Sequence, residues 1–210
     1  MTGSHLRAAP AVTVAFALVL SVSACTQDRA PRRSGSSSST SAPVASAGSQ
    51  PRSAPFRVVV TRVSGKLAKD DRSVLAGNVR RVLTGYVDAA FLGGTYPRSD
   101  FSDSFRTFTG GAAREARRDT GLLTNQRLGP STESVRAVRR TAYLSVLAPY
   151  DVAAGVTAKL DLEFVVRRST EPARRVRLKG RMLLTRNADN GWSIFGYDLS
   201  RSDTAVPEAS

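Results

Sequence analysis

The sequence predicts an α+β domain, with a curved antiparallel sheet and N-terminal helices packed on one face in a cone-like arrangement. Three observations lead to this class. A β-branched segment opens the domain near residue 56, a long helical pattern follows, and from residue 133 onward the apolar period changes to two. Helices that precede a run of consecutive strands typically cover one side of an antiparallel sheet. We expect the domain to span residues 56–202.

The first two elements are a strand and a long helix. Residues 56–63 read FRVVVTRV, and β-branched residues favour extended backbone. Over residues 73–91 apolar side chains recur at helical spacing, which predicts an amphipathic helix. The segment from Asp70 to Ser73 suits the start of this helix, and Gly93 suits its end.

A phenylalanine-rich segment comes next. Phe101, Phe105 and Phe108 stand at helical spacing behind Asp100, a residue typical of a helix N-cap. A second short helix is expected over residues 111–119. We interpret the three rings as core, because aromatic side chains contribute large apolar areas to protein interiors.

Four strands are expected at residues 135–147, 156–166, 176–184 and 192–199. Apolar and polar side chains alternate along them, so one face is buried and the other is charged. A hairpin between the second and third of these strands places Glu163 opposite Lys179 and Asp161 opposite Arg181. Opposite charges across a strand pair stabilise a sheet. These charges therefore have a structural interpretation that needs no ligand.

The first 24 residues have the pattern of an export signal. His5 and Arg7 precede an apolar run, AVTVAFALVLSV, that is too short to span a bilayer comfortably but fits the apolar core of a signal peptide. The run closes in VSAC, residues 22–25, which resembles the lipobox of bacterial lipoproteins. The resemblance implies that Cys25 carries a diacylglyceryl group on sulfur and becomes the mature N-terminus after cleavage. Ordinary secretion and an uncleaved anchor are the alternatives.

A tether and a tail flank the predicted domain. Residues 25–55 are rich in Ser, Ala, Pro and Gly, and a segment with so few large apolar side chains cannot offset the entropy lost on folding. We therefore expect a disordered linker there, and a disordered tail at residues 203–210. With the lipid, this organisation places the domain on the extracytoplasmic face of the plasma membrane.

The order of elements resembles the nuclear transport factor 2-like (cystatin-like) cone that occurs in exported actinobacterial lipoproteins. The features that carry the resemblance are the long first helix, the short Phe-rich helix and the closing hairpin RVRLKGRMLLTRNADNGWSIFGYDLSR. The resemblance covers residues 56–202. It implies a cone whose mouth can hold a ligand, and in the enzymes of this class the pocket carries Asp, His or Tyr.

Positive charge dominates the chain. Lys and Arg number 31 against 17 Asp and Glu, and the formal net charge is +14. Such a field attracts anionic partners, although an arginine bias is also typical of GC-rich bacterial genomes. The polar face of one strand supplies the candidate anion-binding residues Arg175, Arg177, Lys179 and Arg181. Further candidates are Arg114, Arg117, Arg118, Arg136, Arg139 and Arg140.

The residue types exclude several chemistries. His5 and Cys25 are the only histidine and cysteine, and both belong to the signal or the lipid anchor. The mature domain therefore lacks the imidazole and the free thiol that nucleophile pairs and most zinc or redox sites require. Glycine-rich phosphate loops are also absent from the sequence. We assign no catalytic residue, metal or cofactor.

The favoured function is that of a non-catalytic, lipid-anchored envelope protein that binds a partner protein or an anionic envelope polymer through an Arg-rich face. The alternative is a small-molecule or enzymatic pocket inside the cone. The acids and hydroxyls available to such a pocket are Asp88, Asp198, Tyr86, Tyr96, Tyr143, Tyr150 and Tyr197. Nucleic acid is not an expected partner, because no recognition motif is present and export removes the chain from it.

Overall fold

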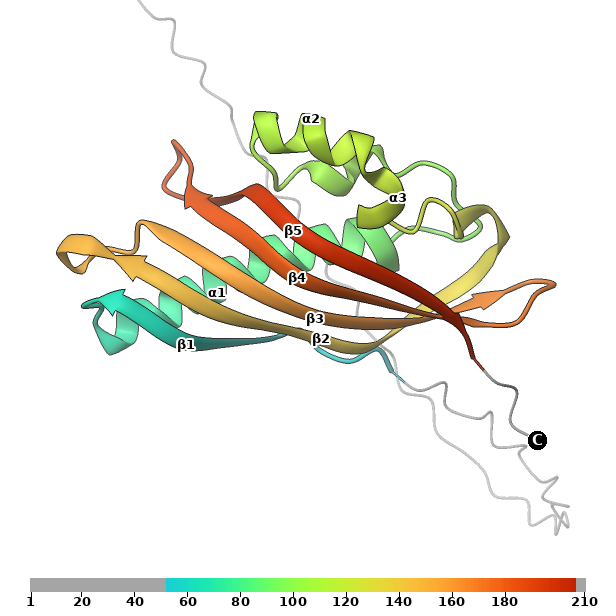
Figure 1. Ribbon diagram of the computed structural model, residues 1–210, viewed down its shortest axis with the longest axis horizontal. Helices are drawn as coiled ribbons and strands as arrows, with labels where there is room; N and C mark the ends of the chain where they lie inside the picture. The colour runs from blue at the N-terminus through green and yellow to red at the C-terminus, as the bar shows by residue number, and fades with distance from the viewer. Residues whose placement is uncertain (1–51, 207–210) are drawn as a thin grey trace, which may run out of the picture. The chain divides into compact units, whose positions relative to one another are not determined.

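The computed structural model describes residues 52–206 of the 210-residue chain. The predictions for the signal peptide, for the lipidated Cys25, for most of the tether and for the end of the tail lie outside the described residues. Inside them the class is α+β, as predicted, with a five-stranded sheet and a few helices (Figure 1). No helix between residues 52 and 206 is long and apolar enough to cross a membrane.

The strands follow one another across the sheet in sequence order. They are β1 Arg57–Gly65, β2 Thr132–Ala148, β3 Gly155–Arg168, β4 Arg174–Arg186 and β5 Trp192–Ala205. β2 to β5 pair antiparallel, as predicted, whereas β1 is parallel to β2. The prediction of an antiparallel sheet is wrong for this pair, and the sheet is mixed. The helical connection between β1 and β2 returns the chain to the edge where β1 began, which makes the two strands parallel.

The last strand runs further than its apolar pattern indicates. β5 continues to Ala205, past the domain boundary that we predicted at residue 202. Ser202 lies opposite Arg177 and Ala205 opposite Arg174, so backbone pairing with β4 holds this polar end. Because the added residues are small or polar, the sequence pattern did not distinguish them from a tail.

The β3–β4 hairpin is tighter than predicted. Glu163 lies opposite Arg177 and Asp161 opposite Lys179, so the predicted pairings with Lys179 and Arg181 are wrong by two residues. The loop between the strands is shorter than the one expected. A shift of two residues leaves every side chain on its predicted face, because side chains alternate with a period of two.

The long helix α1 spans Lys69–Val87 and continues into a π-helical turn, η1, at Asp88–Leu92. It begins before the predicted residue 73, and its N-cap is Ala68, which makes no side-chain cap bond. Asp70 and Asp71, which were expected at the start of the helix, lie in its first turn. A carboxylate there interacts favourably with the helix dipole.

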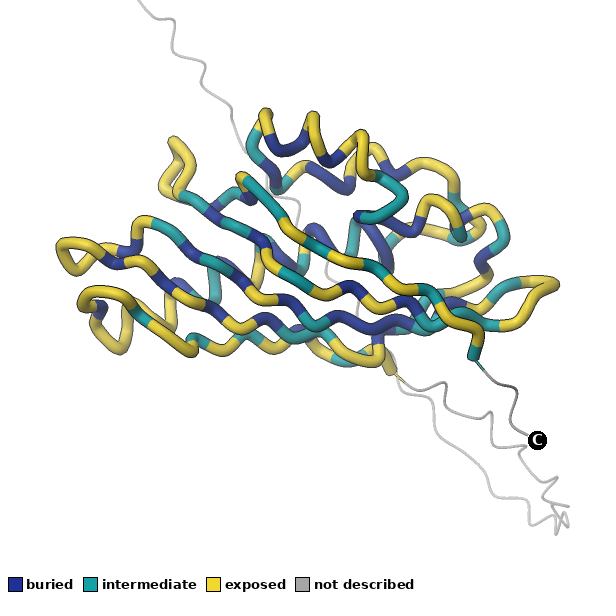
Figure 2. The backbone as a smooth tube through the Cα atoms, viewed as in Figure 1, coloured by how far each residue is buried: buried dark blue, intermediate teal, exposed yellow. Residues whose placement is uncertain are grey.

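One apolar core fills the space between the helices and one face of the sheet. In Figure 2 the strands alternate between buried and exposed residues, as a half-buried sheet requires. Val79 and Leu83 of α1 are fully buried, and Phe91 of η1 stacks on Phe164 of β3 with ring centroids 4.8 Å apart. The three rings predicted to be core are also buried: Phe101, Phe105 and Phe108.

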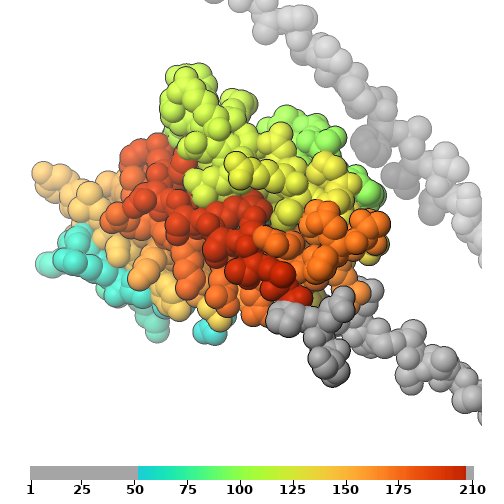
Figure 3. All heavy atoms as spheres, turned by 45° about the vertical axis from the view of Figure 1, so that its right-hand side comes forward, coloured from blue at the N-terminus to red at the C-terminus, as the bar shows by residue number. Residues whose placement is uncertain are grey.

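Short helical segments complete the helical layer. They are η2 Ser102–Phe105, α2 Gly110–Arg118, α3 Thr120–Leu123, η3 Gly129–Ser131 and η4 Pro149–Asp151. Thr109 caps α2, because its Oγ1 accepts a hydrogen bond from the Ala112 amide at 3.4 Å. α2 and α3 pack against β5, and Figure 3 shows these segments side by side on the surface. This packing adds to the helical side of the sheet and leaves its other face open.

Candidate functional site

The candidate site is the face of the sheet that points away from the helices, which we call the open face. Along β3, Phe164 and Val166 are fully buried on the helical side. Lys159 and Arg167 occupy the alternate positions and are exposed. No described helix packs over these alternate positions, so most of their side chains meet solvent.

Basic side chains predominate on the open face. The strand register assigns it ten basic and three acidic residues. The acidic residues are Asp161, Glu163 and Asp198. The basic residues, which we call the basic face, are Arg57, Arg62, Arg136, Arg139, Lys159, Arg167, Arg175, Arg177, Lys179 and Arg181. The four residues predicted to bind anions all belong to this set.

Glu163 is buried on this side of the sheet because two of the predicted arginines cover it. Its Oε1 lies 3.2 Å from Arg175 Nη1 and its Oε2 lies 3.2 Å from Arg177 Nε, and 5% of its side chain is exposed. A buried carboxylate is tolerated when cationic partners compensate it. Since one carboxylate balances two guanidiniums, the cluster keeps a net positive charge.

The other two carboxylates are also held by cations of the basic face. Asp161 Oδ2 lies 2.8 Å from Arg139 Nη1, and its Oδ1 lies 3.9 Å from Lys179 Nζ. Arg181 Nη2 lies 2.8 Å from Asp198 Oδ2, and both of these side chains are mostly exposed. All four predicted residues therefore take part in cross-strand ion pairs, and their first role is structural.

The remaining five basic residues make no ion pair with any described residue. They are Arg57, Arg62, Arg136, Lys159 and Arg167. Only Arg136 was among the predicted binding residues. The alternation of β3 already assigns Lys159 and Arg167 to the polar face, and this signal could have identified them. Arg57 and Arg62 reach the same face only because the register of β1 shifts between Val60 and Arg62, which no alternation pattern indicates. Their charge is not neutralised within the described chain and is available to an anionic partner.

The structure does not bring the other predicted arginines to the basic face. Arg114, Arg117 and Arg118 lie on α2, in the helical layer. Arg140 turns toward the helices, and its Nη1 lies 3.1 Å from Oδ1 of Asp88. These four residues therefore do not contribute to a common surface with β4.

Aromatic side chains fill the interior of the domain, where the alternative hypothesis places a ligand pocket. Tyr86 is fully buried, and its hydroxyl donates to the Leu123 carbonyl at 2.7 Å. The Tyr96 hydroxyl donates to the Phe91 carbonyl at 2.6 Å. Burial raises the pKa of both hydroxyls above the usual tyrosine value. Both groups therefore stay protonated and satisfy the backbone of the fold.

Tyr197 and Asp88, two of the remaining candidates, are also committed to contacts within the fold. The Tyr197 hydroxyl donates to Asp119 Oδ2 at 2.7 Å, and burial together with this carboxylate raises the pKa of Tyr197. Burial raises the pKa of Asp88, while Arg140 opposes that rise. Tyr150 is 96% exposed at the β2–β3 turn. Tyr197 is the one of these groups that contacts a second acid in the described contacts, and its raised pKa keeps it protonated as a hydrogen-bond donor to Asp119.

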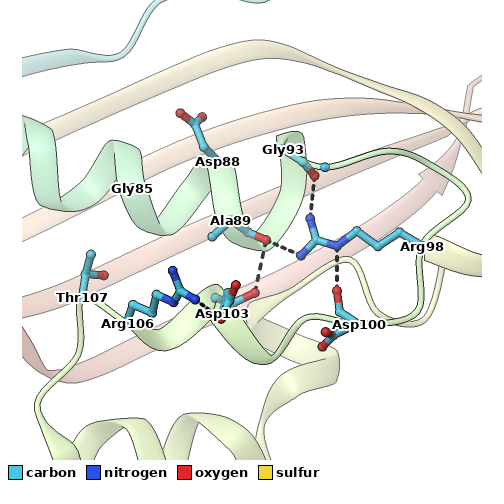
Figure 4. A pocket seen from close by; sticks show the side chains of 11 residues that line it. Gly85, Asp88, Ala89, Gly93, Arg98, Asp100, Asp103, Arg106 and Thr107 are labelled. Carbon is cyan, nitrogen blue, oxygen red and sulfur yellow. Dashed lines mark hydrogen bonds and ion pairs between the residues drawn. The ribbon is translucent and has the colours of Figure 1, made fainter.

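A groove of about 550 Å³ lies between the end of α1 and the segment around η2 (Figure 4). Arg98 crosses it and donates to three backbone carbonyls, among them that of Ala89. Arg106 pairs with Asp103 at 2.7 Å, while the carboxylate of Asp88 points away from these residues. The charged side chains Arg98, Arg106 and Asp88 are therefore already engaged by partners within the fold.

No protein-family model, curated protein or solved structure matches this chain. Between residues 52 and 206, no three His, Cys, Asp or Glu side chains are placed to hold a metal ion. The basic face is therefore the feature of the described residues that points to a function.

Proposed function

We propose that the chain is a non-catalytic envelope lipoprotein that holds an anionic envelope polymer on its basic face. The observation that carries this proposal is the excess of ten basic over three acidic side chains on one uncovered face. Guanidinium groups pair well with carboxylates and phosphates. Residues on one face recur about every 6.7 Å along a strand and about 4.8 Å between strands, which suits a chain of repeated anions.

The sequence VSAC at residues 22–25 supports the proposed location. In this proposal Cys25 carries the diacylglyceryl group, and the tether lets the domain reach polymer on the extracytoplasmic face of the plasma membrane. Two acyl chains make a stable anchor, whereas one holds a protein only marginally. A cationic domain fixed beside the envelope benefits from a high local concentration of anions.

We also propose that the domain is a nuclear transport factor 2-like cone. The packing of α1 along the sheet and the closing β4–β5 hairpin support this assignment. Tyr86, Phe91 and Phe164 fill the space beneath the helices. In this proposal the chain therefore binds its ligand on the outside of the sheet, and a ligand inside the cone is not part of its function.

Retention on an anionic envelope polymer tests the proposed function. Arg136→Gln, Lys159→Gln and Arg167→Gln are combined, because these residues make no ion pair that stabilises the described sheet. Each basic residue near an anionic surface contributes about 1 kcal/mol, so the triple variant should bind on the order of 100-fold more weakly. The matched control removes the same charge from the helical layer, at Arg80, Arg114 and Arg117.

The measurement is the salt concentration that elutes the full-length protein, in detergent, from immobilised polymer. We expect earlier elution of the triple variant and no change for the control, since salt screens exposed charges. Equally weakened retention of both variants would show that binding depends on net charge alone. This result would overturn the assignment of binding to the basic face. Binding to envelope fractions that disappears after protease treatment of those fractions would identify a partner protein instead of a polymer.

A further inference from the structure

The basic face contains a hollow of about 400 Å³ beside the start of β1. β1 begins at Arg57 opposite Thr141, so the part of β2 that precedes Thr141 has no β1 neighbour. Ala54 and Pro55 border this gap. The register shift after Ala137 bends β2 at the same place. The volume lies within the range of small-ligand sites, roughly 300–1,000 Å³.

Three kinds of polar group line this hollow. Thr141 supplies a hydroxyl, Asp161 a carboxylate, and Arg57 and Arg139 two guanidiniums. Arg140 also borders the hollow, but its guanidinium is already bound to Asp88 and to the Ala54 carbonyl. Arg139 donates one hydrogen bond to Asp161 at 2.8 Å, which leaves most of its donors unused in the described contacts. Arg57 makes no ion pair within residues 52–206. Two planar donors and two acceptors therefore surround one small volume.

An aromatic ring completes the lining. Tyr143 lies on the open face next to Thr141 and is 43% exposed. Across the strands its direct neighbours are Val59 and Lys159, so a cation also flanks the ring. The ring has no aromatic partner among the described residues. An exposed aromatic face among hydrogen-bonding groups offers an apolar platform to a ligand that is polar at its edges.

We propose that this hollow is the subsite for one sugar unit that carries a carboxylate, within the polymer bound by the basic face. The apolar face of the sugar ring stacks on Tyr143, and its carboxylate lies between Arg57 and Arg139. Its hydroxyls donate to Asp161 and share a hydrogen bond with Thr141. This inference rests on the proposed function and narrows its ligand from any polyanion to an acidic polysaccharide.

Charge complementarity alone does not account for the hollow. A bare phosphate or carboxylate gains nothing from the Tyr143 ring and is repelled by Asp161. A neutral sugar uses the ring and the carboxylate but leaves the guanidinium of Arg57 without an anion. An acidic sugar uses all four kinds of group at once, which is why the lining favours this ligand over a polyol phosphate or an acidic peptide.

Three matched probes test the subsite by titration calorimetry on the full-length protein in detergent. Tetragalacturonate supplies acidic sugars, its methyl ester supplies the same sugars without charge, and tetraglutamate supplies four carboxylates without sugar rings. We expect tetragalacturonate to bind at least tenfold more tightly than the other two. Tyr143→Ala should lower its affinity about tenfold, to the level of tetraglutamate, and Tyr143→Phe should keep it.

Tyr150→Ala is the control, because it removes an exposed tyrosine outside the hollow. An unchanged thermal midpoint identifies variants that remain folded. Equal affinity for tetragalacturonate and tetraglutamate, with no effect of Tyr143→Ala, would overturn the subsite while the basic face stands. Equal affinity for the acid and its methyl ester would overturn the role of Arg57 and Arg139. Failure of the polymer-retention experiment, by contrast, would remove the proposed function itself.

Discussion

Arg140 Nη1 lies 3.1 Å from Asp88 Oδ1 and joins β2 to the end of α1. The same guanidinium donates through Nε to the Ala54 carbonyl at 2.7 Å, and it lies over the Phe56 ring at 6.0 Å from the centroid. Only 13% of the Arg140 side chain is exposed. One residue therefore connects the sheet, the helical layer and the segment through which the tether enters the domain.

The contact between Arg140 and Asp88 predicts a pH dependence of stability. Burial raises the pKa of Asp88 above its ordinary value of 3.8, and Arg140 only partly opposes this. The folded state then binds the proton more strongly than the unfolded state, so the contribution of Asp88 is present at pH below 3.8 and is lost as pH rises through its raised pKa. As pH rises from 3.8 through the raised pKa of Asp88, we expect the free energy of unfolding of the wild type to fall relative to that of Asp88→Asn. Denaturant titrations at several pH values measure it, and a difference that is constant with pH contradicts the prediction.

Because Glu163 is buried, the free energy of unfolding should depend strongly on its two partners, Arg175 and Arg177, taken together. Replacing Arg175 and Arg177 by Gln leaves a buried carboxylate without compensation, which should lower the free energy of unfolding by about 3 kcal/mol. Either single replacement should cost less, because the other arginine remains. Adding Glu163→Gln to the double variant should restore most of the loss. Urea unfolding of the wild type and the four variants measures these differences, and a triple variant no more stable than the double would argue against the pairing.

Alanine substitutions at two glycines should change the stability of the domain in opposite directions. Gly77 lies inside α1, and a Cβ placed there has no neighbouring atom within 4 Å. Gly77→Ala should therefore stabilise the domain by up to about 1 kcal/mol, the helix-propensity difference. Gly180 has φ of +134°, and a Cβ there would lie 2.1 Å from the Asp198 carbonyl oxygen. Gly180→Ala should destabilise the domain by about 1–3 kcal/mol or more. Thermal unfolding midpoints that move the same way for both would refute the argument.

The proposed anchor predicts the chemistry of the mature N-terminus. Intact mass measurement of protein extracted from membranes should show a chain that begins at Cys25 with added diacylglycerol. Cys25→Ser should abolish the added mass and release the domain from the membrane fraction, because the lone apolar run is too short to span the bilayer comfortably. A wild-type chain that retains Met1, or an unmodified Cys25 sulfur, would exclude the lipoprotein assignment.

Strands with a strict alternation of apolar and charged residues could be predicted from the sequence. The partner and direction of β1 could not. β3 and β4 alternate apolar and charged residues, so both their existence and their faces follow from the pattern. The run from Val58 to Val60 indicates a strand but carries no information about its partner or direction. The parallel pairing of β1 arises from the long helical connection, which no local pattern records.

The sequence predicted several residues of the candidate site but not the contacts between them. Arg175 and Arg177 lie on the predicted face, yet their shared contact with Glu163 depends on a register that a two-residue change in loop length alters. Arg57 and Tyr143 line one hollow only because β1 begins opposite Thr141. Residues brought together by pairing between distant segments therefore required the structure.

The parallel pairing of β1 and β2 also determines how the domain responds to mechanical tension. A pull on the N-terminal side of the described chain enters at Ser53 and Ala54. There the Ala54 amide donates to the Ala137 carbonyl at 2.9 Å, and the Ala137 amide donates to Ser53 Oγ at 3.1 Å. Force directed along β1 acts on the whole β1–β2 ladder in shear, so its bonds share the load and do not peel one after another. In the proposed anchored state, tension between the membrane and a bound polymer would therefore load this ladder of hydrogen bonds in shear.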